Sequence, residues 1–256
     1  MMIKPSRVIL IAVTLLATPA FADEMRVRVF SGSEFALTLE KDESGAPKGL
    51  AMDILDRIST DLNIRFEVKF YPWKRALLAA KNGAVDGIIA AYDSPERRQY
   101  LDYAEKPFYV DKMVVVAHDE WPGVWNGDWQ SLKGQKILQI RGWAYGPEFE
   151  AARTTLNVKT VNNLKDAIRM LFQRQADVVV ADDTGANVEI ERQGYAKIRI
   201  TGPSFQINKG YFAFSKKVGD TAFQRRFNGA FNRMWQSGEM AKLLAKYWMS
   251  NPFDPK

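Results

Sequence analysis

The chain has 256 residues, with 36 lysines and arginines against 30 acidic residues, one histidine and no cysteine. The basic residues form no long run, so the mild positive charge argues against a nucleic-acid-binding protein. Because the chain has no cysteine, it forms no disulfides and we expect no acyl anchor, so hydrophobic burial has to hold the fold together.

Residues 1–22 have the pattern of a secretory signal peptide. Lys4 and Arg7 precede an apolar run at 8–17, and a small-residue site ends at Ala22. The run is about ten residues long, half of the roughly twenty that a membrane-spanning helix needs. We therefore expect cleavage after Ala22 and export to the periplasm of a Gram-negative cell.

Strand and helix patterns then alternate along the mature chain. The first group predicts strands at 26–30, 64–70 and 85–90 and helices at about 50–62 and 73–81. After Trp129 a second group predicts strands at 136–140, near 158 and at 178–180, with helices at 148–153 and 164–173. Strand–helix–strand order implies parallel sheet, so two α/β units are expected.

Two extended stretches, 110–117 and 210–214, are rich in β-branched and aromatic residues and suit strands that cross between the units. An amphipathic helix is predicted at about 220–235, and after Gly238 a second helix runs through 248. Both are expected to pack back on the first unit. The predicted fold is thus α/β with two lobes joined by two crossover strands. Lobe 1 would comprise 23–112 plus 212–256, and lobe 2 would comprise 113–211.

Ser94 and Arg97 follow the third predicted strand directly. Ser94 suits a helix N-cap and Pro95 the first helical position, which would put Arg97 in the first turn beside free backbone N–H groups. Such an arginine makes a receptor for a carboxylate. The same residues also fit a solvated arginine on a short surface helix.

Asp182 and Asp183 close the strand at 178–181, where open α/β sheets place ligand-binding groups. A ligand ammonium group could pair with either carboxylate. Alternatively, one of the two aspartates caps the helix that starts near Thr184 while the other binds.

Aromatic residues occupy similar positions near predicted strand ends. Small-ligand pockets are lined in this way, although each ring could also pack in a core or a loop. Trp73 is the best of them, because Pro72 and Trp73 open a helix at the end of a strand. The candidates for ligand contact are Phe35, Trp73, Tyr92, Trp143 and Tyr145.

Five short segments, in this order, resemble the bacterial extracellular solute-binding proteins of family 3, which include the polar amino-acid receptors of ABC transporters. They are Gly-Ala-Val-Asp-Gly at 83–87, Ser94 with Arg97, Tyr-Ala-Glu-Lys-Pro-Phe-Tyr at 103–109, Ser-Leu-Lys-Gly-Gln-Lys at 131–136 and Gly-Glu-Met-Ala-Lys-Leu-Leu-Ala-Lys-Tyr-Trp at 238–248. The resemblance covers the mature chain. It implies a two-lobed periplasmic-binding-protein (type II) fold.

The resemblance also implies site residues. An arginine at the position of Arg97 grips the ligand α-carboxylate in that family, and an aspartate matching Asp182 pairs with the α-ammonium. This chain departs from the pattern at Tyr92 and Ala90, where small hydroxyl residues are usual, and at 142–146, where Gly-Trp-Ala-Tyr-Gly replaces Gly followed by Ser or Thr. Both departures remove hydroxyls and add rings.

The expected function is a periplasmic binding protein, not an enzyme, that closes on a small carboxylate-bearing ligand and delivers it to an inner-membrane ABC permease. We expect a monomer without cofactor or metal. One alternative is a dehydratase-like enzyme on the same scaffold, with acid-base candidates at Glu34, Asp93, Glu148 and Asp183. Another is a sensory input to a membrane kinase. A triad built on His118 has little support, because no nucleophile-elbow pattern is present.

Overall fold

The computed structural model describes residues 26–254, so the signal peptide expected at 1–22 lies outside the described residues. Nine strands form one sheet, with the order β4-β1-β5-β11-β7-β10-β8-β9 and with β6 (Leu101–Tyr103) paired to β11. A short hairpin of β2 (Glu40–Lys41) and β3 (Pro47–Lys48) stands apart from it.

The first lobe is built on three parallel strands, as predicted. They are β1 (Arg26–Gly32), β4 (Ile64–Phe70) and β5 (Gly87–Tyr92). The helices α1 (Leu50–Leu62) and α2 (Trp73–Lys81) occupy the expected residues. Apolar residues of α1 recur at helical spacing and are buried, which explains why local periodicity located this helix well.

The second lobe repeats the arrangement with three more parallel strands, as predicted. They are β8 (Lys136–Ile140), β9 (Asn157–Val161) and β10 (Val178–Asp182). Its helices are α3 (Pro147–Ala152), α4 (Leu164–Phe172) and α5 (Asp183–Gln193).

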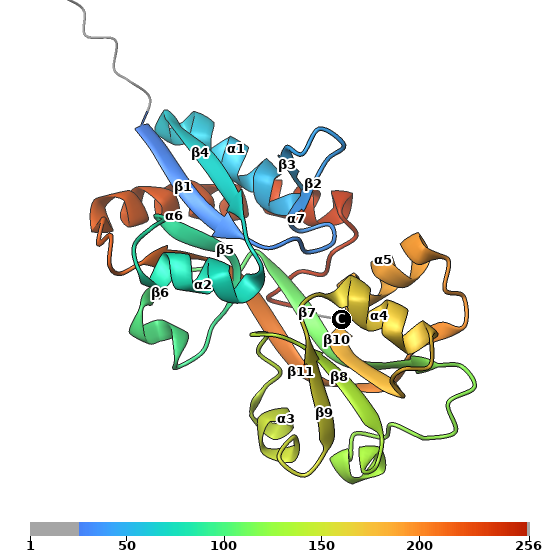
Figure 1. The fold of residues 1–256 in the computed structure, drawn as a ribbon. Helices are drawn as coiled ribbons and strands as arrows, with labels where there is room; N and C mark the ends of the chain where they lie inside the picture. Colours follow the sequence, from blue (N-terminus) through green and yellow to red (C-terminus); the bar gives the residue numbers. More distant parts are fainter. Residues whose placement is uncertain (1–25, 255–256) are drawn as a thin grey trace, which may run out of the picture.

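Two long strands, β7 (Tyr109–His118) and β11 (Ile198–Ser215), run antiparallel to each other between the lobes (Figure 1). The C-terminal part of β11 (residues 210–214) pairs with β5, and β7 pairs with β10. The sheet is therefore continuous through both lobes. β11 begins twelve residues before the predicted stretch (210 − 198). A register shift between Thr201 and Gln206, around Pro203, interrupts the alternation of side chains there and hides the strand from a periodicity search.

The apolar core divides in the same way as the strands. In two clusters the buried residues fall between 30 and 109 or between 212 and 244. In the other two they fall between 113 and 198. The C-terminal helices α6 (Thr221–Gln236) and α7 (Glu239–Lys246) join the first set through Phe227 and Leu244, which confirms that this segment packs back on the first lobe.

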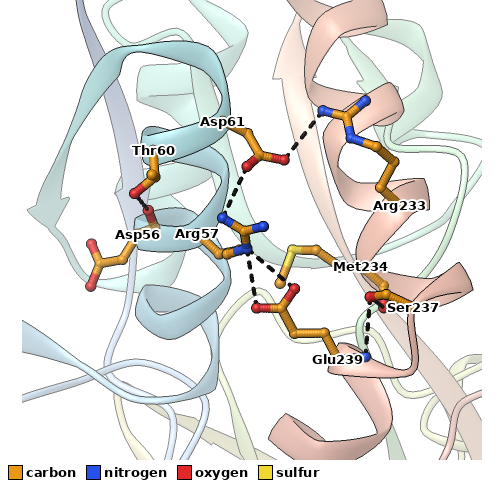
Figure 2. A network of polar contacts seen from close by, with 8 residues as sticks. All are labelled: Asp56, Arg57, Thr60, Asp61, Arg233, Met234, Ser237 and Glu239. Carbon is orange, nitrogen blue, oxygen red and sulfur yellow. Dashed lines mark hydrogen bonds and ion pairs between the residues drawn. The ribbon is translucent and has the colours of Figure 1, made fainter.

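Ion pairs on the surface link α1 to α6 and α7 (Figure 2). Asp61 pairs with Arg57 at 3.0 Å and with Arg233 at 3.2 Å, and Arg57 also reaches Glu239 at 3.2 Å. Exposed pairs contribute about 1 kcal/mol or less each. The buried phenylalanines beneath them therefore dominate the stability of this interface.

Candidate functional site

A cavity lies between the lobes where the carboxyl ends of β5 and β8 meet. Side chains from both lobes bound it and leave a free volume of about 10 Å³, room for roughly one water molecule, so a ligand could enter only if the lobes move apart. Five of the eight predicted ligand residues line it, so the tertiary structure brings most of the candidates together. The lining residues are Phe35, Trp73, Ala90, Tyr92, Arg97, Trp143 and Ala144.

Arg97 is the one arginine, lysine or carboxylate residue among these lining residues, and it is 5% exposed. Its Nη1 donates to the carbonyl of Tyr92 at 3.0 Å, and its Nη2 donates across the lobes to the carbonyl of Gly142 at 3.1 Å. Among the residues the structure describes, Arg97 forms no ion pair. A buried charge held by neutral carbonyls is a good receptor for an anionic ligand group.

The chain around Arg97 differs from the prediction. Instead of a helix after Ser94 there is a single 3-10 turn, η1 (Arg97–Gln99). Ser94 still accepts a hydrogen bond from the Arg97 N–H at its Oγ, 3.3 Å away, and one from the Arg98 N–H at its carbonyl. Ser94 thus shapes the turn that carries Arg97 and does not itself line the cavity.

Three rings form the apolar walls. Phe35 packs edge-on against Trp73 at 5.4 Å between ring centroids, and it lies 5.9 Å from Trp143 of the second lobe. The guanidinium of Arg97 lies over the Trp73 ring at 5.5 Å. A ligand between these rings would meet aromatic faces on several sides and one cation.

Ala90 and Ala144 also line the cavity, and sequence reasoning did not select either as a ligand contact. Alanine carries no chemical signal of its own. The departures from small hydroxyl residues at Ala90 and in the 142–146 segment, which contains Ala144, were the available clues. The small side chains of Ala90 and Ala144 leave space between the lobes that larger side chains would fill.

Tyr145 does not line the cavity in this structure. Its ring is 1% exposed and packs on Phe149 at 5.0 Å, and its hydroxyl oxygen accepts the N–H of Ile140 at 2.7 Å. The tyrosine closes a turn after β8 and belongs to the core of the second lobe.

Asp182 and Asp183 lie one side chain behind the cavity wall. The Asp182 carboxylate caps α5 by accepting the Gly185 N–H, and Asp183 accepts the N–H groups of Lys112 and Thr184. The residue favoured for the ligand ammonium is therefore the helix cap. A third carboxylate, Asp111 of β7, completes an acidic cluster whose oxygens lie within 4.8 Å of one another.

Tyr92 connects this acidic cluster (Asp111, Asp182 and Asp183) to the cavity. Its ring lines the cavity, and its hydroxyl donates to Asp111 at 2.5 Å. Burial, and then repulsion from Asp182, raises the pKa of the Asp111 carboxyl well above its ordinary value. Burial raises the pKa of Asp182 to about 6. Asp111 and Asp182 therefore hold protons at pH values where an ordinary aspartate is ionised.

The four acid-base candidates of the enzyme alternative, Glu34, Asp93, Glu148 and Asp183, do not line the cavity. His118 lies seven residues along β7 from Asp111, roughly 23 Å away. Its Nδ1 accepts the Glu120 N–H at 3.2 Å, within its own turn. The four candidates and His118 therefore do not form part of the cavity wall.

Residues 28–250 match the family described as bacterial extracellular solute-binding proteins, family 3. The chain belongs to this family. The match spans both lobes, and the observed α/β architecture is that of periplasmic binding proteins. Membership carries a solute-binding role outside the cytoplasm. No helix within residues 26–254 has the length and apolar character needed to cross a membrane.

Known members and structures resemble the chain over most of its length. A probable histidine-binding protein from Neisseria gonorrhoeae is 25% identical, over 91% of this chain and 86% of that protein. The substrate-binding protein of an amino acid ABC transporter is 26% identical with a TM-score of 0.74, covering 86% and 98% of the two chains. A histidine kinase sensor domain with similarity to periplasmic binding proteins is 20% identical, with a TM-score of 0.79 and coverage of 88% and 97%.

Proposed function

We propose that this member of the family captures a small carboxylate-bearing ligand, an amino acid or a derivative, by closing its lobes, and delivers it to an inner-membrane ABC permease from the periplasm. The observation that carries the proposal is the buried Arg97 guanidinium on the cavity wall between the lobes. The amino-acid-binding relatives support the ligand class. The protein would act as a monomer without a cofactor.

We place the lobe boundaries at 23–112 plus 212–256 for lobe 1 and 113–211 for lobe 2. The division of the apolar clusters between residues 109 and 113, and again between 198 and 212, supports these positions. Both boundaries fall within β7 and β11, so bending of these two strands would open and close the cavity.

The ligand would place its carboxylate on Arg97 in exchange for the carbonyl of Gly142, and its apolar part between Phe35, Trp73 and Trp143. An ammonium group would face Tyr92, behind which Asp182 and the rest of the acidic cluster lie. Ser94 would hold Arg97 in place from its turn.

A thermal-shift screen tests the ligand class. L-amino acids, opines and small carboxylates are compared with decarboxylated partners, such as L-histidine with histamine and L-arginine with agmatine. A true ligand at a hundred times its dissociation constant adds about 2.7 kcal/mol to the unfolding free energy. Equal stabilisation by an amino acid and its decarboxylated amine would contradict the carboxylate site.

A sensory role is the second candidate, because the histidine kinase sensor domain shares the fold over almost all of its own length. The two roles differ in the membrane partner that reads the closed form. Ligand-loaded protein should stimulate ATP hydrolysis by a permease in proteoliposomes in the first case. In the second case it should change the autophosphorylation of a kinase instead.

A further inference from the structure

Arg192 and Glu40 form an ion pair between the lobes, away from the cavity. Arg192 lies in the last turn of α5 and Glu40 in β2, and the Nη1 and Oε1 atoms are 2.6 Å apart. Figure 1 shows α5 close to the β2–β3 hairpin of the first lobe. The Glu40 side chain is 12% exposed and that of Arg192 is 51% exposed, so the carboxylate is shielded from solvent whereas the guanidinium is half open to it.

The second oxygen of Glu40 holds a turn of the cavity wall. Its Oε2 accepts the N–H of Leu37 at 3.1 Å, and Leu37 has a positive φ of 61°. The turn is closed by hydrogen bonds in both directions between Phe35 and Leu39. Because Phe35 lines the cavity, one carboxylate connects the second lobe to the position of this ring.

The electrostatic surroundings of Arg192 favour the pair. The hydrogen bond to Glu40 is the largest cause that raises the pKa of the guanidinium, and the charges of Glu40, Glu189 and Glu34 act in the same direction against the effect of burial. The Nζ of Lys41 lies 3.4 Å from Oε1 of Glu34 and partly neutralises the charge of that carboxylate. Arg192 therefore has acidic neighbours in both lobes: Glu189 in its own helix, and Glu40 and Glu34 in the first lobe.

We propose that Arg192 and Glu40 form an interlobe clasp that stabilises the closed form and fixes the Phe35 turn in the same event. The inference rests on the proposed closure of the lobes. It differs in kind from the contact between Arg97 and Gly142, which a ligand carboxylate would displace. The clasp remains available when the cavity is occupied, so it would bias closure with or without ligand.

A spin-label distance measurement on the ligand-free, otherwise intact mature protein tests the clasp. The chain has no cysteine, so Lys69→Cys and Lys159→Cys introduce the only two labels, on the exposed faces of the edge strands β4 and β9. Arg192→Gln should lower the ratio of closed to open distances by about two- to fivefold, the range of partly exposed ion pairs. The matched control is Arg169→Gln, which removes an ion pair contained within α4.

Identical distributions in Arg192→Gln and Arg169→Gln would overturn the clasp while leaving lobe closure intact, provided that two distances are seen. A single fixed distance in every variant, with L-histidine, L-arginine or any other amino acid added, would overturn both the clasp and the proposed closure. Glu40→Gln combined with Arg192→Gln should open the lobes no further than either change alone.

Amide hydrogen exchange tests the link to the Phe35 turn. Glu40→Ala removes both contacts and should speed exchange of the Leu37 N–H about tenfold, whereas Glu40→Gln keeps an oxygen for it and should change the rate less. Arg192→Gln should speed the same amide by about two- to fivefold, following the opening of the clasp. No change at Leu37 in Arg192→Gln would disprove the coupling between the second lobe and the cavity wall.

Discussion

Arg97 and the acidic cluster bind opposite ends of Tyr92, and they keep buried ionisable groups in different ways. Arg97 donates to the main-chain carbonyl of Tyr92 and to that of Gly142, so neutral dipoles surround a permanent charge. Asp111 accepts the Tyr92 hydroxyl beside Asp182 and Asp183, and burial raises the pKa of the first two carboxyls. Arg97 is a permanent charge without an ion-pair partner among the described residues, whereas Asp111 and Asp182 can stay protonated when they are buried.

This difference indicates that ligand binding depends mainly on Arg97, whereas the pH dependence of stability depends mainly on the buried carboxyls. A guanidinium cannot lose its proton near neutrality, so its unmet charge is available as binding free energy. Carboxyls with raised pKa values couple folding to pH instead. Substitution of Arg97 should therefore change ligand affinity, whereas substitution of the buried carboxyls should change how stability depends on pH.

Removal of the Arg97 charge should have the largest effect. Arg97→Gln leaves a ligand carboxylate unpaired in the cavity, which costs about 2–5 kcal/mol, or roughly thirty- to several-thousand-fold in affinity. Calorimetry with the amino acid that gives the largest thermal shift measures it. The neighbouring Arg98→Gln, at an exposed arginine paired with Asp93, is the control and should leave affinity unchanged. Equal affinities of both variants would contradict the carboxylate assignment.

Neutralisation of Asp182 should change how stability depends on pH. The folded pKa of about 6 exceeds the ordinary 3.8, so the folded state holds a proton that the unfolded state loses. The unfolding free energy therefore falls as the pH rises from about 4 through 6. Asp182→Asn keeps a good N-cap for α5 and removes this loss, worth about 3 kcal/mol between pH 3 and pH 8.

Denaturant unfolding across this pH range measures the effect of Asp182→Asn. Asp128→Asn is the matched control, because Asp128 also accepts a backbone N–H at a helix start but is exposed. It measures the effect of replacing a capping aspartate by asparagine at an exposed site. Parallel pH profiles for the parent and Asp182→Asn would show that the carboxyl does not titrate as we expect.

Removal of the Tyr92 hydroxyl should have the smallest effect of the three. Tyr92→Phe leaves Asp111 without its donor and should lower the unfolding free energy by about 1–3 kcal/mol. Tyr71→Phe, at a half-buried ring whose hydroxyl has no hydrogen bond among the described residues, should change it by less than about 0.5 kcal/mol. Urea unfolding at pH 7 distinguishes them, and equal losses would mean that the buried hydrogen bond contributes nothing measurable.

Local patterns in the sequence determined much of the fold and part of the site. The apolar spacing in α1 and the Pro72–Trp73 start of α2 depend on residues a few positions apart, so the sequence places both helices correctly. The lobe-and-crossover plan followed from the alternation of strands and helices. Arg97 and four aromatic residues that the sequence offered as ligand contacts line the cavity, because each stands at the end of a recognisable strand or helix.

The tertiary structure alone decided how distant residues share the space between the lobes. Asp182 and Asp183 are adjacent in sequence; the start of α5 makes Asp182 its cap, and the placement of β7 against β10 brings Asp111 beside both. Tyr145 follows the same strand as Trp143 but turns into the core. Glu40 and Arg192 are 152 residues apart (192 − 40), and only the packing of the second lobe against the first brings them together. Such contacts depend on the packing of whole lobes, which no short-range pattern encodes.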